Sequence, residues 1–182
     1  MSSNSVASFA RKSTGEKICQ MTTNQMFPSE FASYVLALCK WFNNAYLIPE
    51  RNGPGGEFVK RVLDEGYANI YHPPDNELRS VSRRTKDVGF WTDKDSKKLL
   101  FADYRNALMN GTFVNRSEAA LTECGQYVFD GNKIEHSRAK ATPDPSSSGE
   151  NHGDIVVADS LACRGIADVA KLEAEVPVEP PA

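Results

Sequence analysis

The stretch Ala45-Tyr46-Leu47-Ile48-Pro49-Glu50, followed by Arg51-Asn52-Gly53-Pro54-Gly55-Gly56, decides the fold of this chain. The apolar run at 45–49 predicts a short, fully buried strand, and the glycines and prolines after it predict a turn. Glu50 then lies at the carboxyl end of a strand, the edge where ligands bind in open α/β sheets. The turn glycines would let backbone approach a bulky ligand, and the helix N-terminus after them favours phosphate. A surface glutamate beside an ordinary turn is the alternative interpretation of Glu50.

Strands and helices alternate on both sides of this stretch. Residues 5–11 and 17–21 predict a hairpin. Residues 28–42 predict a helix that begins at Pro28 and carries an apolar stripe, whose aromatic residues are expected in the core. Further elements are expected as helix 57–65, strand 69–71, helix 95–110, strand 112–115, a short helix capped by Ser117, and a hairpin of 127–129 with 133–135. The order of these elements indicates an α/β fold.

A last helix is predicted from Asp154 to about Ile166. It would pack firmly on the sheet through the apolar residues Ile155, Val156, Ala158 and Leu161. Such packing would hold the Asp154 carboxylate toward the end of the strand at Glu50. Two carboxylates that face each other in this way are how Mg²⁺-dependent nucleases hold their metals. The alternatives are that Asp154 is a simple helix cap, and that Asp159, on a different helical face, is a weaker ligand candidate.

The charge of the chain is close to balanced but unevenly distributed. Its 182 residues fit one domain, and the net charge of −3 lacks the strong basic signal of many nucleic-acid-binding domains. A cluster of catalytic carboxylates is itself acidic, so this charge does not exclude a nuclease. Basic residues concentrate between Arg79 and Arg105. Five of them are candidates for contacts with DNA phosphates, with a solvated surface as the alternative: Arg83, Arg84, Lys86, Lys97 and Lys98.

Several other site chemistries find no support in the sequence. The glycine-rich turn is not a P-loop, because no Gly-Lys-Ser/Thr follows it. The four cysteines form no Cys-x-x-Cys pair and the three histidines lie far apart, so no zinc site is predicted. Free thiols in a reducing cytoplasm are the expected state. No signal peptide or transmembrane run is present in the sequence, so no membrane partner is expected.

The ordered set of these stretches resembles the nuclease domain of the tailed-bacteriophage terminase large subunit. The resemblance extends over nearly the whole chain, up to about Ile166. Each matching piece is weak alone, and their order and spacing make the set more specific. The pieces are 47–52 with the glycines after it, Gly66-Tyr67-Ala68-Asn69-Ile70-Tyr71, Gly89-Phe90-Trp91-Thr92, Glu123 before Tyr127-Val128-Phe129, and His152-Gly153-Asp154.

The resemblance implies a ribonuclease H-like mixed sheet flanked by helices, and endonucleolytic cutting of double-stranded viral DNA during genome packaging. It implies Mg²⁺ or Mn²⁺ as cofactor, with Glu50 on the family's strand glutamate and Asp154 on its last-helix aspartate. Many relatives have two consecutive aspartates where this chain has Gly153-Asp154. The implied partners are double-stranded DNA, an upstream ATPase domain, the portal and the small terminase subunit. The implied location is the cytoplasm of the host cell.

The chain departs from the family in one respect. The family begins this domain with a central strand that carries its first metal-binding aspartate, and residues 1–4 contain no acid. We therefore expect residues 1–168 to be an incomplete nuclease domain that lacks its first strand, followed by a disordered acidic and proline-rich tail at 169–182. Two alternatives remain: a non-catalytic remnant that binds DNA or a packaging partner, and another ribonuclease H-like enzyme such as a resolvase, which would share the carboxylates but not the middle motifs.

Overall fold

The structure, a computed structural model, describes residues 4–74, 88–130, 133–136 and 153–175. Within these ranges it contains five helices and two separate two-stranded antiparallel sheets, which confirms the predicted α/β class. None of the helices in the described ranges has the length and apolar character needed to cross a bilayer.

The N-terminal hairpin forms as predicted. Strand β1 (Ser5–Arg11) pairs antiparallel with β2 (Glu16–Thr23), and the register shifts between Phe9 and Ala10. The outer edge of β2 makes a single parallel bridge, between Glu16 and Val114. This bridge is the part of the predicted strand 112–115 that the structure contains.

Helix α1 (Pro28–Trp41) begins at Pro28, as predicted, because proline fits the first helical turn. The interpretation of its aromatic residues was partly wrong. Phe31 is buried, but Tyr34 is half exposed and Trp41 is 83% exposed. The apolar stripe of the sequence is wider than the buried face, which is formed by Phe31, Ala32, Val35, Leu36 and Cys39. Helix α2 (Gly55–Asp64) packs beside α1.

The predicted buried strand at 45–49 is not a continuous strand. Isolated parallel bridges join Leu47 to Ile70 and Glu50 to Phe90, and residues 45–48 are only half-buried. The expected strand 69–71 is likewise reduced to the bridge at Ile70. The physical reason is that the neighbouring segments form only single-residue bridges with one edge of 45–50. The other edge faces a cavity.

The second half of the chain supplies the remaining elements. Helix α3 (Lys94–Met109) has Asp93 as its cap, and α4 (Glu118–Cys124) begins after Ser117, whose hydroxyl accepts from the backbone N–H of Ala120, as predicted. Strands β3 (Tyr127–Asp130) and β4 (Lys133–His136) form the predicted hairpin.

Helix α5 (Asp154–Glu175) is longer than predicted. It starts at Asp154 but continues beyond Ile166, so the expected domain end at 168 and the expected tail start at 169 fall inside the helix. Residues 167–175 contain neither glycine nor proline, and nothing in that stretch ends a helix. The rest of the expected tail, 176–182, lies outside the described residues.

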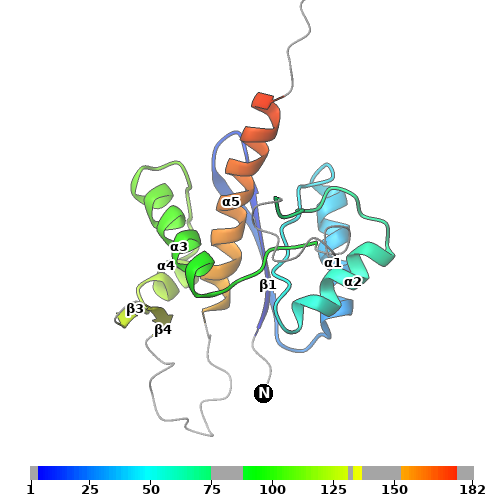
Figure 1. Cartoon of the computed structure of the whole chain (residues 1–182), viewed down its shortest axis with the longest axis horizontal. Helices are drawn as coiled ribbons and strands as arrows, with labels where there is room; N and C mark the ends of the chain where they lie inside the picture. Colours follow the sequence, from blue (N-terminus) through cyan, green and yellow to red (C-terminus); the bar gives the residue numbers. More distant parts are fainter. Residues whose placement is uncertain (1–3, 75–87, 131–132, 137–152, 176–182) are drawn as a thin grey trace, which may run out of the picture.

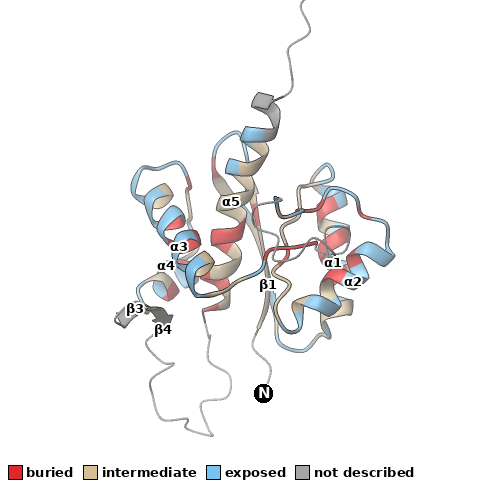
Figure 2. Ribbon diagram, in the orientation of Figure 1, coloured by how far each residue is buried: buried red, intermediate tan, exposed pale blue. Residues whose placement is uncertain are grey.

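The elements form layers around β1 and α5. Figure 1 shows α5 alongside β1 at the centre, with α1 and α2 on one side and α3, α4 and the β3–β4 hairpin on the other. The buried residues fall into two clusters, one centred on α1 and α2 and the other on α3 and α5. Figure 2 shows buried residues, in red, in both α3 and α5, which pack against each other. Helix α5 thus connects the N-terminal hairpin to the second half of the chain.

Candidate functional site

Glu50 is held in place by the turn that follows it. The Arg51 N–H donates to the Phe90 carbonyl (2.9 Å), and the Asn52 side chain forms paired hydrogen bonds with the backbone of Thr92 (2.6 and 2.8 Å). Gly55 packs directly against the Glu50 carbonyl, where any Cβ would overlap the oxygen. This glycine therefore serves the packing of the turn on its own backbone, a role that the ligand-approach interpretation did not include.

Asp154 is the first residue of α5 and is tied to the start of β1. Its Oδ2 accepts a hydrogen bond from the backbone N–H of Asn4 (2.9 Å). Gly153, just before it, has φ of +88°, and its carbonyl accepts from the Tyr127 hydroxyl (2.9 Å). A Cβ at Gly153 would overlap the Tyr127 phenol. The Gly153-Asp154 sequence is therefore required by this local packing, which leaves no room for an aspartate at 153.

The structure places Glu50 and Asp154 on the wall of one cavity of about 1450 Å³. Both carboxylates also act on the same phenol. Burial raises the pKa of Tyr127, and the negative charges of Glu123, Asp154 and Glu50 raise it further. Glu50 and Asp154, far apart in the sequence, thus line one cavity, and the charges of both act on the same phenol.

Glu123 is a third acid whose charge acts on Tyr127, and sequence reasoning assigned it no role in the site. It is 2% exposed, and its Oε1 accepts from the backbone N–H of Val156 in the first turn of α5 (2.7 Å). Its Oε2 is buried and has no hydrogen-bond partner in the described part of the chain. Burial raises the pKa of Glu123, and the Asp154 charge adds to this. The signal in the sequence that could have indicated Glu123 is its spacing of three residues from Ala120, which places both residues on the buried face of α4.

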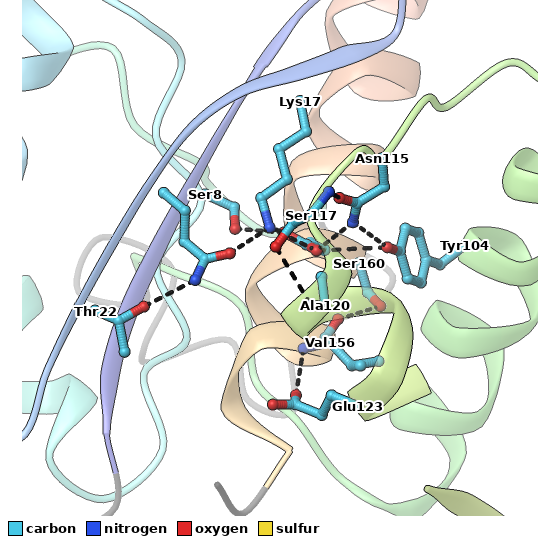
Figure 3. A network of polar contacts seen from close by, with 12 residues as sticks. Ser8, Lys17, Thr22, Tyr104, Asn115, Ser117, Ala120, Glu123, Val156 and Ser160 are labelled. Carbon is cyan, nitrogen blue, oxygen red and sulfur yellow. Dashed lines mark hydrogen bonds and ion pairs between the residues drawn. The ribbon is translucent and has the colours of Figure 1, made fainter. Parts of the chain in front are cut away.

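Asp159 does not line this cavity. It belongs to a polar network with Ser8, Lys17, Tyr104 and Asn115, which are labelled in Figure 3. It is completely buried and forms an ion pair with Lys17 (2.7 Å), whose side chain is 4% exposed. The hydroxyls of Ser8 and Tyr104 and the amide of Asn115 also donate to its carboxylate. The lower rank given to Asp159 as a metal ligand agrees with this geometry, because its oxygens are occupied by donors from other elements.

The candidate DNA contacts are described only in part. Arg83, Arg84 and Lys86 lie outside the described residues. Lys97 places its ammonium 5.4 Å from the centre of the Phe101 ring and 5.7 Å from that of Tyr127. Lys98 is exposed.

The donors that a metal ion would find at this site are few. No group of three His, Cys, Asp or Glu placed to hold a metal ion occurs in the ranges that the structure describes. Glu50 and Asp154 nevertheless line one cavity with hard oxygen donors. Glu123 does not line this cavity, and its buried Oε2 has no hydrogen-bond partner within the described ranges. Mg²⁺ is commonly held by one or two carboxylates together with waters and substrate phosphates, so these residues fit a weak site for it.

Comparison with protein-family models gives no match, and comparison with curated proteins gives none either.

Proposed function

We propose that this chain is a metal-dependent endonuclease domain that acts on double-stranded DNA, of the kind found in phage terminase large subunits and with a ribonuclease H-like fold. The observation that carries the proposal is the shared cavity wall of Glu50 and Asp154. Clustered carboxylates at the end of an extended segment and at a helix start are the donors that two-metal nucleases use.

Glu50 and Asp154 would hold Mg²⁺ or Mn²⁺. The metal supplies Lewis-acid stabilisation of charge on the scissile phosphate and activates water. The chain's own part is to fix the two carboxylates. The Asn52–Thr92 hydrogen bonds fix the turn after Glu50, and the Tyr127–Gly153 hydrogen bond fixes the start of α5. Lys97 lies beside the Tyr127 ring and offers a positive charge to a DNA phosphate.

A non-catalytic function is the second candidate. Three described acids line the cavity, Glu50, Glu57 and Asp154. Glu57 already accepts a hydrogen bond from the Ser29 hydroxyl, and the buried Glu123 caps α5, which would leave a metal weakly held. In that case the chain would bind DNA or a packaging partner without cutting.

The two candidates are separated by measuring metal binding and cleavage on the same samples. The first arm follows Mn²⁺-dependent nicking of supercoiled plasmid, and the second follows Mn²⁺ binding by the paramagnetic relaxation of water protons. Glu50→Gln and Asp154→Asn should each abolish nicking and weaken Mn²⁺ binding by at least tenfold. Glu30→Gln, which alters an exposed acid on α1, should leave both unchanged.

The outcomes discriminate clearly. Mn²⁺ binding that depends on both acids, without nicking, favours the non-catalytic candidate. Nicking that survives both substitutions contradicts the assignment of Glu50 and Asp154.

A further inference from the structure

The cavity that holds the two acids continues as a long slot between two extended segments. We call it the β1 slot: it is bordered by β1 on one side and by residues 45–50 on the other. Its volume of about 1450 Å³ exceeds the roughly 300–1,000 Å³ typical of clefts for small molecules. A longer, extended occupant fits it better.

Residues 45–50, which form one border of the slot, have backbone groups that make no hydrogen bond within the described ranges. The N–H and carbonyl of Leu47 bond to Asn69 and Tyr71, and the Pro49 carbonyl accepts from Phe90. Backbone groups alternate in direction along an extended chain, so those of Tyr46 and Ile48 point the opposite way, toward the slot. Within the described ranges, neither residue makes a backbone hydrogen bond.

The other border is the edge of β1 that faces away from β2, which pairs with no strand in the part of the chain that the structure describes. Strand β1 lies in a sheet of two strands with β2, and the outer edge of β2 already carries the bridge to Val114. Alternate backbone groups of β1 must point away from β2 in an antiparallel pair. They point toward the slot, which residues 4–12 line along their whole length. Both borders therefore offer backbone donors and acceptors to the same space.

The two remaining walls are helical and largely apolar. Helix α5 contributes Val157, Ala158, Leu161 and Ala162, and helix α1 contributes Phe31, Val35 and Cys39. Along 45–50 the side chains alternate between these walls: Leu47 packs with the α1 cluster, whereas Tyr46 and Ile48 pack with the α5 cluster. A peptide strand bound in the slot beside residues 45–50 would have one face against α1 and the other against α5. A strand that is buried on both faces needs apolar side chains on both.

The two acids determine the charge at one end of the slot. The Asn4 N–H reaches Asp154, so β1 begins at the end where Asp154 lies. The Glu50 charge acts on the same Tyr127 phenol as Asp154, which places Glu50 at that end too. A basic side chain at the end of an occupant would complement these carboxylates when no metal is bound.

We propose that the β1 slot binds an extended peptide segment by strand addition to both of its borders, with apolar side chains on both faces and a basic residue at the acidic end. Main-chain hydrogen bonds give affinity in this mode, and the alternating side chains give specificity. The bound strand joins the β1–β2 sheet to residues 45–50. Metal binding is not required for this interaction, so it stands apart from the nuclease proposal.

Synthetic peptides test the proposal directly on the full chain in metal-free buffer. The probe is an acetylated peptide with a core of six alternating valine and alanine residues and a lysine at each end. Its matched control carries methyl groups on every core backbone nitrogen, which removes the N–H donors. A third peptide has glutamate in place of both lysines. Calorimetry should show binding of the first peptide, and at least tenfold weaker binding of the other two.

Chain variants locate the bound peptide. Ala158→Trp places a bulky side chain on the α5 wall of the slot and should weaken binding at least tenfold. Ala37→Trp makes the same change on the exposed face of α1 and should have no effect. Amide hydrogen exchange in the parent chain gives a measure that does not depend on the folding of a variant. The Tyr46 and Ile48 amides should exchange at least tenfold more slowly with the peptide bound.

Three results would overturn the proposal. The first is equal binding of the N-methylated peptide, and the second is unchanged amide exchange at Tyr46 and Ile48. The third is a concentration-dependent dimer, detected by sedimentation, in which a second copy of the chain occupies the slot. A failure of nicking in the plasmid assay leaves this proposal intact, and a failure of peptide binding leaves the metal assignment of Glu50 and Asp154 intact.

Discussion

Asp159 is a buried charge whose partners come from four other parts of the chain, one of them Tyr104 on α3. Lys17 comes from β2, Ser8 from β1, and Asn115 from the segment after α3. None of these partners is close to Asp159 in the sequence, so periodicity alone could show the apolar face of α5 but not what its one buried acid contacts. The network ties the N-terminal hairpin to α5 through charge as well as through apolar packing.

Replacing Lys17 measures the strength of this tie. Lys17→Met leaves the Asp159 carboxylate buried without its counterion, and breaking one side of a buried pair costs about 3–5 kcal/mol. We expect a loss near the lower end, because Ser8 and Asn115 still donate to the carboxylate. Urea unfolding followed by circular dichroism gives the free energy of unfolding.

The control for this prediction is the exposed pair of Lys60 and Asp64, whose side chains are 78% and 58% exposed. Surface pairs of this type contribute about 0–1 kcal/mol, so Lys60→Met should change the free energy of unfolding by no more than that. Equal effects of the two substitutions would show that the Lys17–Asp159 pair does not hold the hairpin.

At the scale of elements, local signals predicted what local forces build. The turn around Gly15, Pro28 at the start of α1 and the Ser117 cap each specify backbone conformation within a few residues, and all three elements formed as predicted. The segment 45–50 was the exception. Its apolar composition reflects its position between two helical layers. Strand formation also requires a neighbouring segment that pairs with it over several consecutive residues, and the sequence pattern does not show whether one is present.

The start of α5 depends on Gly153. Gly153→Ala introduces a side chain at φ of +88°, which costs about 1–3 kcal/mol, and its Cβ would also collide with the Tyr127 phenol. Gly111→Ala is a matched control, because Gly111 has φ of +68° with no atom near its Cβ position. Gly153→Ala should therefore lower the free energy of unfolding more than Gly111→Ala does. In a Tyr127→Ala background that difference should shrink, since the collision is gone. A difference that persists there would contradict the packing explanation.

On the scale of the whole molecule, the sequence predicted the class of fold, and the two acids that it singled out, Glu50 and Asp154, line the same cavity. Those two positions follow from general rules about strand ends and helix starts. Glu123 could not be assigned in this way, because its role depends on α4 packing across the first turn of α5. The β1 slot is also a property of the assembled layers. It arises because β1 and 45–50 are each packed between the same helices but do not pair with each other.

The buried Glu123 makes global stability depend on pH. Its pKa is raised from the ordinary value of 4.5, mainly by burial, so the folded state holds this proton more tightly than the unfolded state. Stability from this group is fully present below about pH 4.5 and is lost as pH rises through the higher folded-state pKa. Glu123→Gln cannot ionise and lacks this loss. Urea unfolding at a series of pH values above 4.5 should show the parent chain losing stability relative to Glu123→Gln.

Glu118→Gln, at an exposed position on the same helix, controls for the change in net charge and should follow the parent chain. Partly exposed acids such as Glu16, whose pKa is lowered by its hydrogen bond and charge pairing with Arg116, shift stability in the opposite direction with pH. The comparison therefore uses the difference between variant and parent, in which those contributions cancel. If that difference is constant across the pH range, Glu123 has the same pKa in both states, and its carboxylate is not held neutral beside Asp154.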